Sequence, residues 1–215
     1  MAIGSWFNQL AAITAMNLRN LPARIGTSLV AVIGIGGVVA VLVSLLSMGE
    51  GFRAALDLSG SDDVALVLRG GSSDELSSSI NREQVNVIVS APGIRRDALG
   101  PVASPEFYTI VDLPMRSTGT AANVPFRGVT SRATDVRTGF RMVAGRMFER
   151  GKDEVIVGRG AFAQFGNVDL GREVKWGSHL WRVVGVFEAG GSISESELWT
   201  DLTVLQGVYR RGNSV

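Results

Sequence analysis

The sequence of 215 residues contains no cysteine and a single histidine. A chain without cysteine has no disulfide framework, no cysteine-based zinc site and no cysteine for a lipid anchor. This composition is compatible with a bacterial extracytoplasmic domain that is large enough to fold without cross-links. With no second histidine beside it, His179 makes a poor metal site, and we expect it to be an ordinary solvent-facing side chain.

Neither sign of charge is in excess. The chain has 21 basic and 20 acidic residues, a net charge of +1. Only two of the basic residues, Arg19 and Arg24, precede Glu50, so the remaining part has 19 basic and 20 acidic residues and no basic block. Nucleic-acid binding therefore lacks its electrostatic basis, and we expect no nucleic-acid partner.

Motifs for nucleotide binding are missing. The run GIGG at 34–37 lies within an apolar stretch and not between a strand and a helix, so it is no dinucleotide fingerprint. The segment GRMFERGKD resembles a phosphate-binding loop, but Gly145 stands one residue too early and Asp153 follows Lys152. We expect no ATP binding and no cofactor in this chain.

Motifs for catalysis and metal binding are missing as well. No G-x-S-x-G elbow accompanies the histidine. Carboxylates cluster at 62–63, at 74–75 and at 195–201, but none of these clusters follows the calcium-loop pattern. We expect these side chains to be solvated or to cap helices, and we predict no catalytic residue and no metal site.

One long apolar run dominates the amino-terminal part. Ile25 to Gly49 are 25 residues without a charged residue or a histidine. At about 1.5 Å per residue, a helix of this length covers roughly 37 Å, which is enough to cross a hydrocarbon core of about 30 Å. A cleaved signal peptide is the rival interpretation, but its apolar core has about 7 to 15 residues and an A-x-A-like exit. We therefore predict a permanent transmembrane helix at 23–49.

The charges on either side of this run predict its orientation. Two arginines and no acidic residue precede it, whereas Glu50, Asp57, Asp62 and Asp63 follow it. The positive-inside rule then keeps the amino terminus in the cytoplasm and exports residues 50–215.

Two further patterns concern the membrane. Before the run, apolar residues that include Trp6, Phe7, Leu10 and Ile13 recur at helical spacing up to Pro22. We interpret residues 1–22 as an amphipathic helix in the cytoplasmic interface, with a lead-in of no special role as the alternative.

Within the run, Gly36, Ala40 and Ser44 repeat every four residues. This spacing makes a shallow stripe on which another helix could pack closely. A lone anchor needs no such stripe, whereas a helix bundle does.

Residues 50–215, which follow the apolar run, are predicted to form a single α+β domain. A helix is expected at 81–93, with Asn81 as N-cap, Gln84 completing a capping box and Pro92 near its end. Short helices are expected at 159–166 and 200–211, the second capped by Thr200. Strands are expected at 63–71, 106–115, 123–129, 153–158, 172–177 and 180–189. The stretches 70–79 and 116–123 are expected to be exposed loops.

The order of these pieces resembles the amino-terminal half of the MacB/FtsX-like ABC transporter permeases. The resemblance is carried by NLRNLPARIGTSLVAVIGIGGVVAVL and SMGEGF around the helix, and then by VLRGGSSDE, PFRGV, AGRMFERGKDEVIVGRGAFAQFG and LGREVKWGSHLWRVVGVFEAGGSISESELWTDL. It implies one membrane helix followed by a MacB-like periplasmic core domain. Such permeases continue into three more membrane helices, so we expect the sequence to be a fragment or a shortened relative.

The resemblance also implies a function. A separate ATPase binds and hydrolyses ATP, and the periplasmic domain of the permease transmits the resulting motion to a substrate or partner. The expected partners are the ABC ATPase subunit, a second permease copy (the same chain or a paralogue), a periplasmic adaptor protein and the lipid bilayer of the bacterial inner membrane. A stand-alone membrane-tethered scaffold and a tethered hydrolase remain as alternatives.

Overall fold

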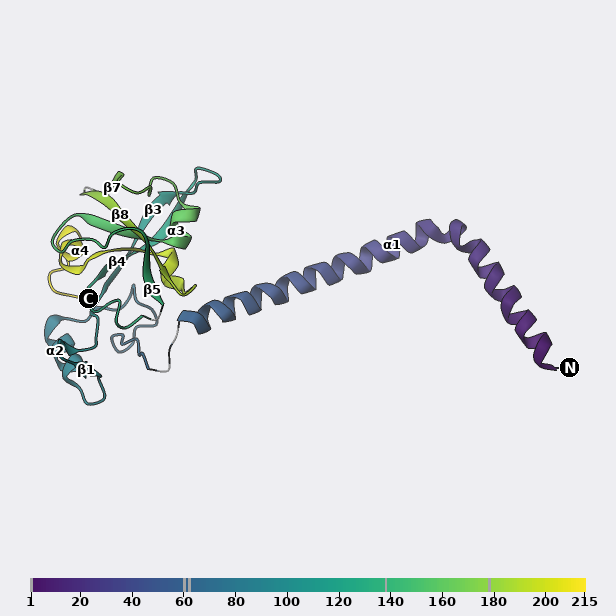
Figure 1. The fold of residues 1–215 in the computed structure, drawn as a ribbon, viewed down its shortest axis with the longest axis horizontal. Helices are drawn as coiled ribbons and strands as arrows, with labels where there is room; N and C mark the ends of the chain where they lie inside the picture. Colours follow the sequence, from purple (N-terminus) through teal and green to yellow (C-terminus); the bar gives the residue numbers. More distant parts are fainter. Residues whose placement is uncertain (1, 60, 62, 138, 178) are drawn as a thin grey trace. The chain divides into compact units, whose positions relative to one another are not determined.

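The computed structural model describes every residue except 1, 60, 62, 138 and 178 (Figure 1). At 2–5, 21, 23–24 and 55–59 it describes the helix backbone alone. The chain divides into two compact units, Met1–Arg53 and Ala54–Val215, which are taken in turn.

One helix makes up the first unit. Helix α1 runs over Ala2–Ser59 and contains Pro22. Since proline donates no backbone hydrogen bond and its ring clashes with the preceding turn, it commonly bends a helix, and Figure 1 shows α1 bending in its purple, amino-terminal part. The segment Ile25–Ala54 is long and apolar enough to cross a membrane, and none of it is buried.

The boundaries of α1 differ from those of the two amino-terminal segments expected from the sequence. The sequence suggested an interface helix at 1–22 and a membrane helix at 23–49, whereas α1 is continuous and its apolar segment extends to Ala54. The first compact unit likewise ends at Arg53 and not at Gly49. Which residues lie in a bilayer and which in its interface stays a prediction.

A mixed β-sheet forms the centre of the second unit. In the part of the chain that the structure describes, it has seven strands, in the order β3-β4-β9-β6-β8-β5, with β7 also paired to β8. The pairs β4–β9 and β6–β8 are parallel, and the others are antiparallel. The strands are β3 Phe107–Pro114, β4 Ala121–Val129, β5 Phe140–Gly145, β6 Glu154–Gly158, β7 Glu173–Trp176, β8 His179–Ala189 and β9 Leu198–Asp201.

Short helices and a hairpin complete this unit. They are α2 Arg82–Ser90, α3 Arg159–Gln164, the 3-10 helix η1 Ile193–Ser196 and α4 Leu202–Val208, with the paired strands β1 Arg96–Asp97 and β2 Gly100–Pro101. Figure 1 shows α2 and β1 together in a small lobe beside the sheet.

Each face of the sheet has its own hydrophobic core. The larger core packs around Phe126, which contacts Trp176 and Trp181 edge to face at centroid distances of 5.3 and 4.9 Å. The smaller core centres on Trp199, which stacks with Phe140 and contacts the tilted ring of Phe187. Residues at alternate positions of a strand face opposite sides, so the central strands β6 and β9 are buried throughout.

The fold class is the expected one, and several elements are confirmed in detail. The capping box of α2 is present as predicted, with Asn81 and Gln84 bonding each other's backbone. Strands lie within each of the predicted stretches 106–115, 153–158, 172–177 and 180–189. β4 begins at Ala121, two residues before the predicted strand, so that the hairpin turn takes up only part of the expected loop.

Two local predictions are wrong, and some strands were missed. The stretch 63–71 forms no strand and has one isolated bridge, between Ser61 and Val64. Thr200 lies in β9, and the cap of α4 is Asp201, whose carboxylate accepts hydrogen bonds from the backbone N–H groups of Thr203 and Val204. Strands β1, β2, β5 and β9 were not expected.

Candidate functional site

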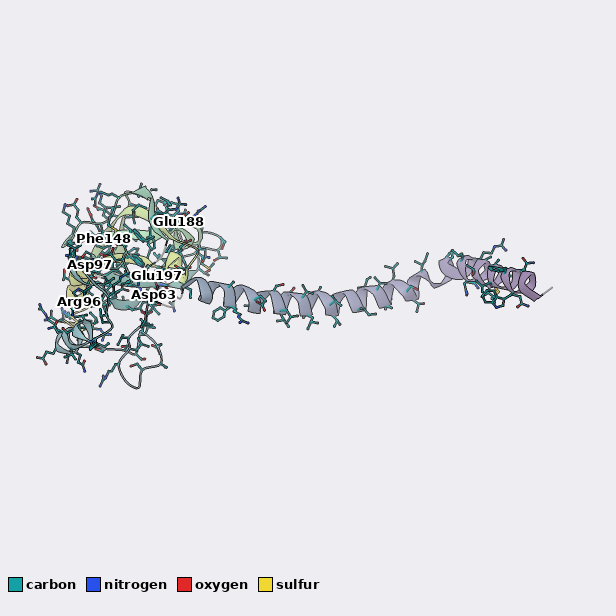
Figure 2. The ribbon with its side chains drawn as sticks, turned by 60° about the horizontal axis from the view of Figure 1, so that its bottom comes forward. Asp63, Arg96, Asp97, Phe148, Glu188 and Glu197 are labelled. Atoms are coloured by element: carbon teal, nitrogen blue, oxygen red, sulfur yellow. The ribbon has the colours of Figure 1, made fainter. Side chains whose placement is uncertain are left out.

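The predicted packing stripe lies on an exposed part of α1. A Cβ added at Gly36 would meet no atom within 4 Å, and Ala40 and Ser44 are exposed. The hydroxyl of Ser44 donates to the carbonyl of Ala40 at 2.7 Å, so its hydrogen-bonding need is met within the helix. Figure 2 shows side chains projecting outward along α1. The role of the stripe stays a prediction.

The predicted interface residues are exposed as well. Trp6, Phe7, Leu10 and Ile13 have exposed fractions of 59, 62, 48 and 60%. Positions 6, 10 and 13 share one face of a helix. Their role at a membrane interface stays a prediction.

A buried cluster of arginine and glutamate lies in the second unit. Arg127 of β4 bonds both oxygens of Glu197 through Nε and Nη2 at 2.8 Å, and both oxygens of Glu75 at 2.7 and 2.9 Å. Its Nη1 also contacts Glu106 at 3.1 Å, so all five N–H hydrogens of the guanidinium are used. Arg137 bonds both oxygens of Glu106. We call these five residues the Arg127 cluster.

The electrostatics of the Arg127 cluster favour the charged forms of Arg127 and Glu106. Burial opposes the charge of Arg127, but the charge of Glu197 and the hydrogen bonds that Arg127 donates to Glu75 and Glu197 hold its pKa well above the usual value. Burial would also raise the pKa of Glu106, and the hydrogen bonds and charge of Arg137 outweigh it, so that this pKa is lowered. Because three carboxylates face two guanidinium groups, every removal of an arginine leaves an uncompensated charge.

Aromatic rings enclose the cluster. The indole N–H of Trp199 donates to Glu197 at 2.7 Å, and the guanidinium groups of Arg137 and Arg127 lie 4.7 Å from the ring centroids of Trp199 and Tyr108. Stacking of this kind holds the planar guanidinium in place. Figure 2 labels Glu197 within the second unit.

The cluster connects parts of the chain that are far apart in sequence. Glu75 lies in the irregular segment between α1 and α2, Glu106 directly precedes β3, and Glu197 directly precedes β9. A second link joins the same irregular segment to the end of the sequence, because Ile80 and Val215 exchange two backbone hydrogen bonds of 2.7 and 2.9 Å. The segment that follows α1 is thus bonded to the rest of the second unit at two residues: Glu75 contacts Arg127, and Ile80 contacts Val215.

The Arg127 cluster was not predicted from the sequence. Glu75 and Glu197 belong to carboxylate groups that were expected to be solvated, but Glu197 is buried and Glu75 is part-buried. Arg127 stands between Phe126 and Gly128 in an apolar strand, and a charge in such a place is the one signal that could have pointed to a buried ion pair.

Two other ion clusters lie nearer the surface. Glu154 accepts two hydrogen bonds from Arg146 and one from the backbone of Glu149, and the bond from Arg146 is the main cause that lowers its pKa to about 2. Glu188 pairs with Arg141 and Arg159, whose side chains are 70 and 66% exposed. These arrangements stabilise charges and offer no unpaired nucleophile.

The single histidine is paired and half-buried. His179 Nε2 lies 2.7 Å from Asp153 Oδ1, beside an open hollow of about 430 Å³ that α4 also lines. Outside the five undescribed positions, no group of three or more histidine or acidic side chains could hold a metal ion. Glu195 accepts hydrogen bonds from the backbone of Ala189 and Gly191, so it shapes a turn.

Comparison with known proteins gives a family. A model of the MacB-like periplasmic core domain matches residues 28–215. The structure is similar to the crystal structure of the periplasmic region of MacB from Actinobacillus actinomycetemcomitans, with a TM-score of 0.49 and 15% identity over 69% of each chain. It is also similar to the extracellular domain of the ABC-type transporter YknZ from Gram-positive bacteria, with a TM-score of 0.44 and 21% identity over 63% of this chain and 69% of that one. A search of curated proteins gives no match.

Proposed function

The chain belongs to the family of the MacB-like periplasmic core domain, and on this premise we propose that it is a permease subunit of an ABC transporter. Its second unit transmits ATP-driven motion to a substrate or partner outside the inner membrane. ATP is bound and hydrolysed by a separate ATPase subunit, and this chain is not an enzyme.

One observation carries this proposal. The family match starts at residue 28, within the apolar segment Ile25–Ala54, and continues to residue 215. The apolar segment and the α+β domain therefore belong to one family unit. This supports a function in which a membrane helix and an exported domain act together.

The fastening of the segment after α1 supports a mechanical function. Movement of α1 along or across the membrane pulls on the chain that follows it. Among the described residues between Ser61 and Ile80 there is no helix or strand, apart from the bridge between Ser61 and Val64. The pull therefore reaches the sheet where the chain is first held firmly, at Glu75 through Arg127 and at Ile80 through Val215. Buried charged contacts resist such a pull better than exposed ones, because breaking them leaves charges unpaired.

The proposal includes partners and an orientation. The amino terminus is cytoplasmic and the second unit is periplasmic, by the charge pattern around the apolar segment. The permease works with the ATPase subunit and with a second permease copy, either this chain or a paralogue, and with a periplasmic adaptor. The stripe Gly36, Ala40 and Ser44 packs against another membrane helix.

Purification from the source cells tests the proposal. An affinity tag is added to the chromosomal copy of the gene, the membranes are solubilised in mild detergent, and the tagged protein is isolated with its partners. We expect an ABC ATPase to copurify and the sample to hydrolyse ATP. A catalytic-glutamate variant of that ATPase is the control for contaminating activity.

A matched variant tests the mechanical part. Glu75→Gln keeps the shape of the side chain but weakens its bonds to Arg127. We expect the variant to bind the ATPase normally and to lose ATP-dependent changes in the protease sensitivity of the second unit. A chain that purifies without any ATPase would instead favour the stand-alone scaffold.

A further inference from the structure

The carboxylates of the Arg127 cluster outnumber its guanidinium groups by one, and they are not equally buried. The side chain of Glu75 is 29% exposed, against 10% for Glu106 and 5% for Glu197. Glu75 is therefore the carboxylate that water reaches most easily, and water can solvate its charge when it leaves the cluster. Two carboxylates would then face two guanidinium groups.

The other members of the cluster keep their bonds when Glu75 leaves. Arg127 still donates from Nε and Nη2 to Glu197 at 2.8 Å and from Nη1 to Glu106 at 3.1 Å. Arg137 still donates to both oxygens of Glu106 at 2.6 Å. No buried charge is left without a partner, so the large cost of breaking a buried ion pair from one side is avoided.

Glu75 belongs to a loop whose own hydrogen bonds are local. The loop consists of residues 69–78, and the N–H of its first residue donates to the hydroxyl of Ser78 at 3.0 Å. Inside it, the N–H of Ser77 donates to Asp74 Oδ1 at 2.8 Å. Both bonds join members of the loop to each other, so they are kept if the loop moves as a body. We call these residues the Glu75 loop.

We propose that the Glu75 loop is a latch with two states, one in which Glu75 binds Arg127 and one in which Glu75 lies in water. The sheet stays folded in both states, because the rest of the cluster remains bonded. The latch rests on the mechanical role proposed above for the pull that opens it. Once it is open, the chain from Glu75 to Ile80 can extend to at most roughly 17 Å before the pull reaches the sheet.

The excess of one carboxylate predicts which changes hold the latch closed and which open it. Glu106→Gln removes the excess, so that release of Glu75 would leave two guanidinium groups with one carboxylate, and the closed state is favoured. Arg137→Gln enlarges the excess and favours the open state. If Glu106 only supported the fold, its replacement would loosen the loop instead.

The absence of native cysteine allows spin labels to follow the loop in the full chain in detergent. Labels at Leu76→Cys and Asp112→Cys, both at exposed positions, report the distance between the loop and β3. Tryptophan fluorescence reports the folding of the sheet in the same samples. We expect urea to lengthen and broaden the distance between the labels before the sheet unfolds, because the latch opens locally.

Variants of the labelled chain test the charge balance. Glu106→Gln should move the opening to higher urea, whereas Arg137→Gln and Glu75→Gln should move it to lower urea. Glu173→Gln, at an exposed position of β7, is the control and should leave the opening unchanged.

Several results would overturn the latch. In the native chain, a loop that separates only when the sheet unfolds has no open state of its own. Opening at lower urea in Glu106→Gln would contradict the charge balance. If that variant does not fold, Glu75→Gln decides, because opening at the native urea concentration would show that Glu75 does not hold the loop. No ATPase is present, so the latch can fail where an ATPase copurifies and succeed where none does.

Discussion

Arg127 and Trp199 lie opposite each other in the parallel register of β4 and β9, and both donate hydrogen bonds to the carboxylate of Glu197. The carboxylate is therefore neutralised and hydrogen-bonded from two neighbouring strands at once. The same arginine also forms an ion pair with Glu75. One guanidinium group therefore contacts both the sheet, through Glu197, and the segment after α1, through Glu75.

Removal of this guanidinium should destabilise the second unit strongly. Arg127→Met leaves the carboxylates of Glu75, Glu106 and Glu197 with Arg137 as their one remaining partner in the cluster. Removing one partner of a buried ion pair lowers the free energy of unfolding by about 3–5 kcal/mol. Urea unfolding of the full chain in detergent, monitored by tryptophan fluorescence, measures this loss of stability.

The matched control is Arg159→Ala, which also deletes the arginine partner of a glutamate, Glu188. Its side chain is 66% exposed, and exposed pairs contribute about 0–1 kcal/mol. Equal losses for the two variants would mean that the Arg127 cluster is no more stabilising than a surface pair.

Acid should destabilise the fold through Glu154. Its pKa is lowered from a usual 4.5 to about 2, because Arg146 and the backbone of Glu149 bind the ionised form. A lowered pKa in the folded state adds stability above pH 4.5, and this contribution is lost as the pH falls from 4.5 toward 2. Thermal unfolding at pH 6, 4 and 2.5 should therefore show a falling midpoint.

The variant Glu154→Gln isolates this group. It should be less stable than the native chain at pH 6 and should lose less on acidification, because the amide has no proton to gain. Some pH dependence of stability should remain in the variant, because the pKa values of Glu106 and Glu188 are also lowered. Parallel pH profiles for the two proteins would contradict the assignment.

Local signals in the sequence were sufficient for much of the fold. The capping box at Asn81 and the β-branched runs of β3, β6 and β8 depend on near neighbours, which the sequence displays directly. β9 was missed because its residues Leu198–Asp201 become a strand by pairing with β4 and β6, which are distant in sequence. The segment 63–69 fails in the opposite way, since its composition favours a strand, but among the described residues it forms only the isolated bridge between Ser61 and Val64.

The candidate site was harder to predict for the same reason. Arg127 and Glu197 are 70 positions apart, and only the parallel register of β4 and β9 brings them together. The predictions for Gly36 and Trp6 use spacing within one helix, α1, and their roles in the membrane stay predictions.

Close packing between β6 and η1 should make Gly158 intolerant of a side chain. A Cβ there would lie 2.2 Å from the backbone oxygen of Glu195. Overpacking against backbone costs about 1–3 kcal/mol, so Gly158→Ala should lower the melting midpoint by several degrees. Gly70→Ala is the control, because a Cβ at Gly70 meets nothing within 4 Å. Equal midpoints for both variants would show that η1 moves away freely.

Reporter fusions should reveal an exported second unit. Arg19 and Arg24 precede the apolar segment and Glu50 follows its first 25 residues, so the amino terminus is expected inside. Alkaline phosphatase fused after Val215 should be active, whereas the same enzyme fused after Arg24 should be inactive. The reverse pattern would overturn the orientation and the proposed function with it.

The small-residue stripe of α1 should be required for assembly. Gly36→Leu with Ala40→Leu fills the groove on which another helix backbone would lie, and membrane helices associate through such close packing. Leucine is favourable in lipid, and a Cβ at Gly36 meets nothing within its own chain, so insertion and the second unit should be unaffected. In the complete transporter we expect normal amounts of protein in the membrane but a loss of ATP-coupled activity or of ATPase copurification. The control Val38→Leu with Leu42→Ile changes bulk off the stripe and should be nearly silent. Full activity of the stripe variant would mean that this face of α1 contacts lipid, and α1 would then be an anchor only.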